Sequence, residues 1–216
     1  MNVSFNNVLA DVVLRMLQDH PYHTLPILYA LANEDKMGNY VGAAQYKSKI
    51  SNERMTSAKN ILQRLKSKNH LVSLVDSMNH LLTAFNDLAI ASTSEQQKKG
   101  QLTKIGFKEI QPRGSTFLDN TNKLIQNAST KPFVITSPLS LRSDANYTNH
   151  VVYIHEYVEK FSITDSGVSR PKIIECRGSD GVLYKQLVKG GDDMRQDAVM
   201  QQVPRSTFLY RLFYFN

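Results

Sequence analysis

A single cysteine, Cys176, stands among the 216 residues, so the chain has no pair with which to form an internal disulfide. Such a sequence fits a reducing compartment such as the cytosol or the nucleus. Long apolar runs are also missing, because none approaches the roughly 18 residues that a membrane span needs. Residues 1–10 have no basic start followed by an apolar core. We therefore expect neither a membrane segment nor a signal peptide.

The histidines are too scattered to predict a metal site. His20 and His23 have the spacing of one helix face, but Pro21 lies between them, so we interpret them as part of a helix junction. His150 and His155 are an odd number of residues apart, which would place them on opposite faces of a strand. Because one cysteine cannot complete a zinc-type set, no metal ligand is predicted.

Neither charge nor cysteine chemistry gives a strong functional signal. The net charge of +7 is compatible with nucleic acid or anionic lipid as a partner. However, the densest basic stretch, residues 59–68, is typical of the solvated face of a helix, so we do not expect direct DNA binding. Cys176 follows Glu175, which would raise rather than lower its pKa, and this favours a small buried residue over a nucleophile.

Helical periodicity dominates the first ninety residues. The apolar residues of 8–17, 22–33, 51–68 and 71–90 recur at three- and four-residue spacing, which predicts helices that pack on one another. Pro26 lies inside the second pattern, in its first turn or at a kink. The predicted packing stripe of the first helix consists of Val8, Val12, Val13, Leu14, Met16 and Leu17.

The chain changes character after a polar connector at residues 91–114. Short runs rich in β-branched and aromatic residues predict strands at 133–136, 151–158, 172–176 and 182–189. The Asp180-Gly181 pair between the last two strands predicts a hairpin turn. We expect a loop at 162–170, and a helix over 192–203 with Asp192 or Asp193 as its N-cap. The predicted fold is therefore α+β, a helical region followed by a small antiparallel sheet with one helix.

One strand ends in a lysine that can serve a nucleotide. Alternation along 182–189 puts Leu187 and Lys189 on one face and Val188 on the other. An apolar side chain can cover a base while the ammonium beside it reaches phosphate oxygens. By itself the pattern is weak, because a strand that ends in lysine is usually only a solvated end.

Long sequence strings make this pattern more specific. Residues 171–181 (PKIIECRGSDG) and 186–203 (QLVKGGDDMRQDAVMQQV) closely resemble the kinase N-lobe of the phosphatidylinositol-3-kinase-related protein kinases, in particular the ATM-like serine/threonine kinases. Residues 19–25 (DHPYHTL) with 30–33 (ALAN) resemble the end of the helical FAT region, which precedes the kinase domain in that family. Between these strings the resemblance depends mostly on helical pattern.

The resemblance implies an ATP site. Lys189 matches the ATP-phosphate lysine, Asp192 the acidic residue that pairs with it, and Leu187 an apolar wall of the adenine pocket. Residues 165–171 match the phosphate-covering loop, where backbone N–H groups can meet phosphate; neither this chain nor the family has G-x-G-x-x-G there. The implied ATP-binding residues are Ser166, Gly167, Val168, Ser169, Arg170, Pro171, Leu187, Lys189 and Asp192.

The groups that complete phosphoryl transfer are not found in the sequence. The reaction needs a residue that positions the hydroxyl and carboxylates that bind magnesium, which this family places downstream of the matched helix. No Asp-Phe-Gly occurs, and no segment matches a catalytic loop. We therefore expect a lobe that binds ATP, with magnesium implied only by the resemblance, a missing C-lobe, no catalytic residue and no activity of the chain alone.

The family match breaks at Pro204, and an aromatic tail follows. We expect four segments: the end of a FAT-like helical region at 1–40, a helical connector at 41–130, the ATP-binding N-lobe at 131–203 and the unmatched tail at 204–216. We interpret the tail as a product of alternative splicing, a retained intron or an incomplete gene prediction; the rival explanation is a genuine short product whose tail packs on the lobe.

Three functions stay open on the sequence. The first is the ATP-binding lobe of an ATM-like kinase fragment, for which the resemblance implies a nuclear parent protein in the DNA-damage response. The second is a non-catalytic helical module that binds protein partners through its helices. The third is a basic nucleic-acid binder. The oligomeric state cannot be read from these residues.

Overall fold

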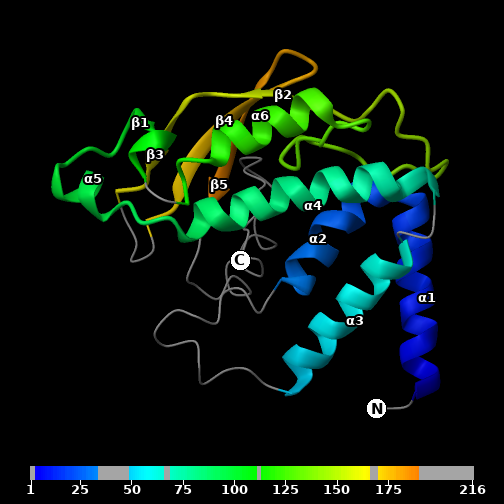
Figure 1. The fold of residues 1–216 in the computed structure, drawn as a ribbon. Helices are drawn as coiled ribbons and strands as arrows, with labels where there is room; N and C mark the ends of the chain where they lie inside the picture. Colours follow the sequence, from blue (N-terminus) through cyan, green and yellow to red (C-terminus); the bar gives the residue numbers. More distant parts are fainter. Residues whose placement is uncertain (1–2, 34–48, 66–68, 111–112, 166–169, 190–216) are drawn as a thin grey trace, which may run out of the picture.

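The computed structural model describes residues 3–33, 49–65, 69–110, 113–165 and 170–189, and the statements below concern these residues. Helices gather at one side of the molecule, a small sheet lies at the other, and α4 runs between them (Figure 1). The larger helices are α1 (Val3–Asp19), α2 (Pro21–Ala32), α3 (Lys49–Leu65), α4 (Asn69–Ile90) and α6 (Phe117–Asn127), with a short α5 (Ser94–Lys98).

The first four predicted helices are present, with differences in detail. Pro21 stands at the start of α2, where its missing N–H removes no helical hydrogen bond. Pro26 lies in the second turn of α2, and the helix continues through it. Tyr29 ties α2 to α4, because its buried hydroxyl donates to the Val75 carbonyl at 2.7 Å.

The predicted packing stripe of the first helix is only half correct. Leu17 is fully buried, but the side chains of Val8, Val12 and Met16 are 60%, 50% and 48% exposed. Leu9 lies on the same face and is also exposed. The apolar residues of α1 therefore cover more of its circumference than α2 and α3 can contact, and an apolar face is left open.

The sheet is antiparallel and centred on β4. Its strands are β1 (Ile105–Gly106), β2 (Ile154–Tyr157), β3 (Lys160–Ile163), β4 (Lys172–Gly178) and β5 (Leu183–Val188). One edge of β4 pairs with β5 along its length, while β3 and β2 pair with successive parts of the other edge. The predicted α+β class, helices followed by a small antiparallel sheet, is confirmed.

In the second half of the chain, one strand prediction was wrong and two predicted segments have different bounds. Residues 133–136 form no strand beyond an isolated bridge between Phe133 and Tyr153, because Ser137 closes a turn by donating its hydroxyl and its N–H to the Val134 carbonyl. The strand expected at 151–158 is limited to β2. The loop expected from residue 162 begins later, since Ser162 and Ile163 still pair with Ile173 and Lys172 in the sheet.

Aromatic rings fill the space between the sheet and the helices that cover it. Phe117 of α6 stacks on Phe107 and Phe85, with ring centroids 4.9 and 5.8 Å apart. Its edge also meets Tyr157 of β2 at 5.1 Å. Phe161 of β3 extends the cluster to Phe107 at 4.9 Å. These contacts fix α4 and α6 against one face of the sheet.

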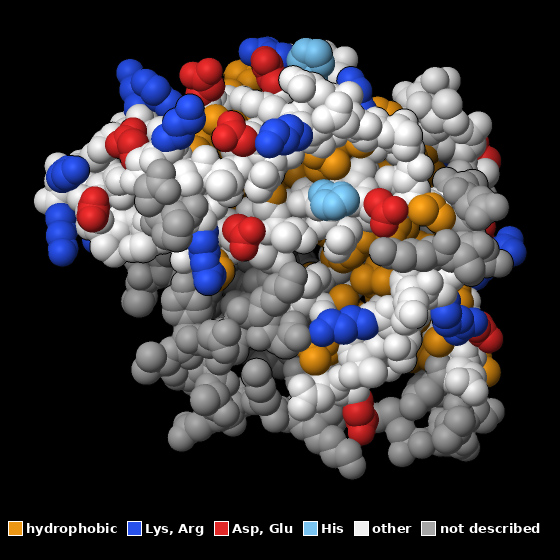
Figure 2. Space-filling view, in the orientation of Figure 1, with side chains coloured by type: hydrophobic (Ala, Val, Ile, Leu, Met, Phe, Trp, Pro, Cys, Tyr) orange, Lys and Arg blue, Asp and Glu red, His pale blue; other side chains and the backbone are white. Residues whose placement is uncertain are grey.

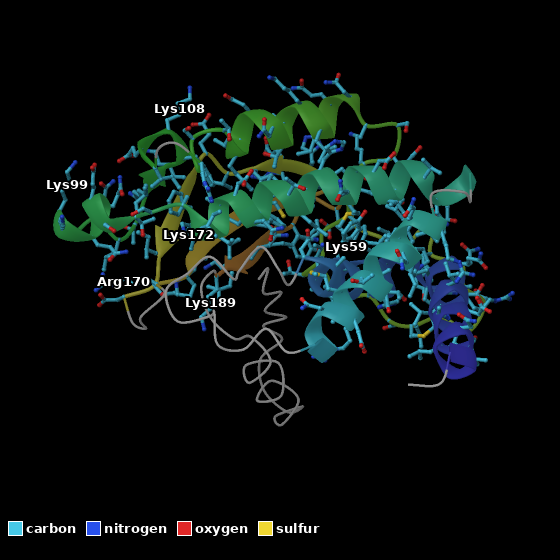
Figure 3. The ribbon with its side chains drawn as sticks, turned by 60° about the horizontal axis from the view of Figure 1, so that its bottom comes forward. Lys59, Lys99, Lys108, Arg170, Lys172 and Lys189 are labelled. Carbon is cyan, nitrogen blue, oxygen red and sulfur yellow. The ribbon has the colours of Figure 1, made fainter. Side chains whose placement is uncertain are left out.

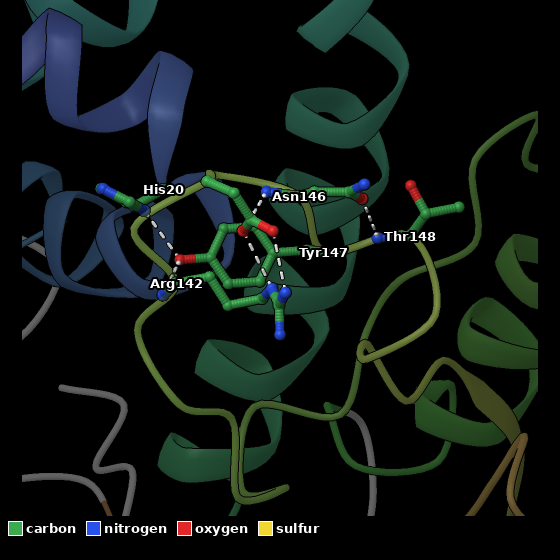
Figure 4. Close-up of polar contacts among 6 residues, drawn as sticks. His20, Arg142, Asn146, Tyr147 and Thr148 are labelled. Carbon is green, nitrogen blue, oxygen red and sulfur yellow. Dashed lines mark hydrogen bonds and ion pairs between the residues drawn. The ribbon is translucent and has the colours of Figure 1, made fainter.

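Hydrogen bonds join the helical side to the loop that leads into the sheet (Figure 4). The Tyr147 hydroxyl lies 2.7 Å from Nδ1 of His20, which sits between α1 and α2. The loop is shaped by an Arg142–Asp144 ion pair at 2.8 Å, and this neighbour lowers the pKa of the Asp144 carboxyl to about 2. His20 and His23 both contact Tyr147, His23 with ring centroids 5.6 Å apart, and so have the helix-junction role that the sequence predicted.

None of the described helices combines the length and the apolar character that crossing a membrane requires.

The aromatic cluster gives a stability prediction. Replacing Phe117 with alanine removes a buried ring that touches three others, and we expect the free energy of unfolding to fall by about 3–5 kcal/mol. Urea denaturation followed by circular dichroism measures this change. Leu141→Ala, at an exposed position, is the control and should stay within about 0.5 kcal/mol of the parent chain. Equal effects of the two substitutions would contradict the proposed core.

Candidate nucleotide-binding site

The candidate site is built on the β4–β5 hairpin. Six residue pairs in continuous register join the two strands, and the predicted Asp180-Gly181 turn connects them. Gly181 has a φ of 80°, which glycine adopts without steric cost. The Asp180 carboxylate accepts the Val182 N–H at 3.0 Å. The hairpin prediction is confirmed. The hairpin holds the end of β5 in a defined register.

The two faces of the hairpin differ in burial. On β4, Lys172, Ile174 and Cys176 are buried, whereas the residues between them are only half-buried. On β5, Val188 is buried and Leu187 is half-buried. Leu187 and Val188 therefore lie on opposite faces of β5, as predicted. Helices α4 and α6 cover the first face, and the second is more open.

An apolar pair lies on the more open face next to Lys189. Ile173 and Leu187 are direct cross-strand partners, so their side chains stand side by side. Lys189 follows the last residue of β5 and is half-buried. Sequence reasoning identified Leu187 and missed Ile173. Applying the same alternation to both strands of the predicted hairpin would have found it.

Basic residues gather at this end of the sheet. Figure 3 shows Arg170, Lys172 and Lys189 near one another, with Lys59 on α3 further away. The chain returns to β4 through Arg170 and Pro171, and the Pro171 carbonyl accepts the Thr164 N–H at 3.0 Å. Arg170 has a φ of 38°, a conformation that few non-glycine residues adopt and one that is found at functional sites.

Several predicted residues lie outside the described part of the chain. The structure brings Arg170, Pro171, Leu187 and Lys189 to one end of the sheet. The residues that the structure does not describe include the centre of the expected phosphate loop, the helix expected at 192–203 and the tail at 204–216. The candidate residues among them are Ser166, Gly167, Val168, Ser169 and Asp192.

Lys172 is a buried cation that the sequence interpretation did not single out. Its side chain is on the covered face of β4, with the residue only 4% exposed, and Nζ donates to the Ala89 carbonyl at 3.2 Å. Burial lowers the pKa of this amine to about 8. The signal was present in the sequence, because alternation places Lys172 on the same face as Ile174 and Cys176.

Cys176 lies in the same buried row. Burial, followed by the charge of Asp180, raises the pKa of its thiol to about 12, so the thiolate is scarce at neutral pH. The expectation of a small buried residue is confirmed.

Charged side chains are dispersed over the visible face of the molecule. Figure 2 shows Lys and Arg interspersed with Asp and Glu over its described surface, without a continuous basic stripe. Ion pairs on the strands include Arg177–Glu156 at 3.0 Å and Lys185–Glu175 at 3.7 Å. This distribution gives no support to a nucleic-acid groove on that face.

The buried amine predicts a pH dependence of stability. The Lys172 pKa is about 8 in the folded chain against 10.5 for an ordinary lysine, so above pH 8 the unfolded chain binds more protons. The free energy of unfolding therefore rises with pH in this window, by about 2 kcal/mol between pH 8 and 9.5. Urea denaturation of the parent chain and of Lys172→Met measures the rise, which the variant should lack. The tyrosines, which also titrate at high pH, are the same in both proteins. Parallel curves of unfolding free energy against pH would therefore contradict the assignment of the rise to Lys172.

Comparison with known proteins gives consistent matches along nearly the whole chain. No family model matches it. The serine-protein kinase ATM of Sus scrofa is 32% identical over 213 residues, which cover 93% of this chain and 6% of that protein. The serine/threonine-protein kinase TEL1 of Gibberella zeae is 31% identical over 203 residues, which cover 94% of this chain and 6% of that kinase.

Solved structures match the same extent of the chain. The FAT and kinase domain of CtTel1 superimposes with a TM-score of 0.72 at 29% identity, over 94% of this chain and 12% of that one. The complete CtTel1 dimer with C2 symmetry gives the same TM-score over 7% of its chain. The chain thus spans about 6% of the length of the curated relatives. Within that span, its homologues are the ATM and Tel1 kinases of the phosphatidylinositol-3-kinase-related family, and its fold matches the FAT and kinase domain of CtTel1.

Proposed function

We propose that this chain carries the ATP-binding N-lobe of an ATM/Tel1-type serine/threonine kinase. The observation that carries the proposal is the juxtaposition of the Ile173–Leu187 pair with Lys189 at one end of the β4–β5 hairpin. The apolar pair covers the adenine, and the Lys189 ammonium contacts phosphate oxygens. Arg170 and Pro171, which lead into β4, border the phosphates from the neighbouring segment.

The proposal extends to residues beyond the described part of the chain. Asp192 pairs with Lys189, and backbone N–H groups of Ser166, Gly167 and Ser169 meet the phosphates. Magnesium accompanies the ATP, with ligands that this sequence does not supply. The division into segments 1–40, 41–130, 131–203 and 204–216 stays part of the same proposal.

Phosphoryl transfer itself is assigned to the full-length kinase. A lobe that holds ATP supplies positioning and charge, but transfer also needs a group that orients the hydroxyl and carboxylates that hold the metal. We therefore propose that these residues bind ATP without turning it over when they are alone. The nuclear site and the DNA-damage response implied by the family resemblance are proposals for that full-length kinase.

A helical interaction module is the second candidate, and a specific observation favours it. Val8, Leu9, Val12 and Met16 form one exposed apolar face of α1, the kind of surface that packs against another helix. This function is compatible with ATP binding, because α1 lies on the other side of the molecule from the hairpin end (Figure 1).

The ATP proposal predicts a specific binding signal. Titration of the labelled chain with Mg-ATP should shift the amide resonances of Ile173, Leu187 and Lys189 in NMR spectra. A lone lobe covers only one side of the nucleotide, so we expect a dissociation constant on the order of 1 mM, or about 4 kcal/mol of binding. Lys189→Met should remove the phosphate-dependent part of the shifts.

Lys185→Met is the matched control for that experiment. Lys185 stands on the same strand, but it is exposed and its amine lies 3.7 Å from a Glu175 carboxylate oxygen, so its loss should leave ATP binding unchanged. The ATP proposal fails if several millimolar Mg-ATP moves none of these resonances. Nucleic-acid binding that falls steeply with salt would instead support the basic-binder hypothesis.

A further inference from the structure

A row of paired residues crosses the sheet at its nucleotide end. Ile163 of β3, Lys172 of β4 and Val188 of β5 are direct neighbours in the register. Lys172 therefore stands immediately after Pro171 in the chain and beside the residue that precedes Lys189. Whatever fixes Lys172 in space also fixes the backbone on both sides of the candidate phosphate site.

The side chain of Lys172 is anchored outside the sheet. Its ammonium donates to the Ala89 carbonyl in the last turn of α4. Carbonyls in the last turn of a helix have no partner within the helix, and the helix dipole is negative there. A cation at this place thus makes a directional connection between the covering helix and the sheet end.

Stability alone does not explain a lysine at this position. The other inward-facing residues of β4 are Ile174, Cys176 and Gly178, and the partner Val188 is apolar. Removing an ammonium from water is unfavourable, and a well-packed apolar side chain is often as stable at such a site. Burial also lowers the Lys172 pKa, which shows that the fold disfavours the charged form.

We propose that Lys172 is a positioning residue of the nucleotide site, which sets the distance between the Arg170–Pro171 segment and Lys189 by fastening the end of β4 to α4. This role depends on the proposed ATP function and deepens it. Lys172 lies on the covered face of the sheet, so it acts through the backbone. Without the bond to Ala89, the end of β4 is held only by its strand partners and its packing.

The proposed role predicts that loss of the Lys172 anchor weakens contacts with the phosphates and leaves contacts with the adenine base unchanged. Ile173 and Leu187 are held by register pairs that continue to Arg177 and Leu183, so the adenine wall keeps its shape when the strand end moves. Lys189 follows Val188, which is the last residue of β5 and the register partner of Lys172, so its position depends directly on this end of the sheet. Loss of the Lys172 anchor should therefore weaken ATP far more than adenosine.

The experiment titrates the full 216-residue chain with Mg-ATP and, separately, with adenosine, and follows the Leu187 and Lys189 amide resonances. We expect Lys172→Met to weaken Mg-ATP binding about fivefold to tenfold and to leave adenosine binding unchanged. Lys172→Arg keeps a charged donor and should recover most of the ATP affinity. Lys185→Met is the control for loss of a positive charge on the hairpin.

Each other outcome has a definite meaning. The positioning role is overturned if Lys172→Met binds Mg-ATP as the parent chain does, if it loses ATP and adenosine equally, or if Lys172→Arg recovers nothing. A parent chain that binds neither ligand overturns the ATP function, and this role with it. If circular dichroism shows that Lys172→Met does not fold, Lys172→Leu removes the same donor with a different shape, and the same criteria apply.

Discussion

The double-sided pairing of β4 is the constraint on which the rest of the structure depends. One edge of this strand holds β5 in unbroken register, and the other edge holds β3 and then β2. Its inward residues face the aromatic cluster beneath α4 and α6, so the strand cannot slip by one residue without turning that row to the open side. The positions of Leu187 and Lys189 follow directly, because β5 has no partner other than β4 among the described strands.

Local signals in the sequence predicted the parts of the fold that depend on local chemistry. The Asp180-Gly181 turn and the alternation that separates Leu187 from Val188 were predicted correctly. Strand β3 was not, since Lys160–Ile163 acquires its strand character from pairing with β1 and β4. Phe133 was placed in a strand because its neighbours are β-formers, yet a turn closed by Ser137 competes successfully with pairing. Tertiary pairing thus decided β3, and a local turn decided residues 133–137.

The candidate site shows the same division between local and tertiary information. Leu187 and Lys189 were found because a strand end and a family string coincide there. Ile173 and Lys172 were overlooked, although both belong to the matched string, because their importance lies in what they face across the sheet. Lys172 in particular breaks the rule that inward positions are apolar, and such local exceptions tend to mark functional positions. A cation that the fold disfavours and that touches the covering helix is best explained by the geometry it imposes on its neighbours.

Helix α4 links the two halves of the molecule and so links the two candidate functions. In its first half, the Val75 carbonyl accepts a hydrogen bond from the Tyr29 hydroxyl of α2, and at its end the Ala89 carbonyl accepts one from the Lys172 ammonium of β4. The His20–Tyr147 bond adds a second connection from the α1–α2 junction to the loop before β2. The buried core is continuous across these connections. The open face of α1 therefore belongs to the same packed body as the candidate nucleotide end of the sheet. Rigid attachment alone does not make the two sites allosteric, since coupling needs an element with two arrangements that both ligands bias differently. Such an element would act on ATP at the end of β4 that carries Lys172. There the Lys172–Ala89 hydrogen bond connects α4, which contacts both halves of the molecule, to the backbone beside Lys189.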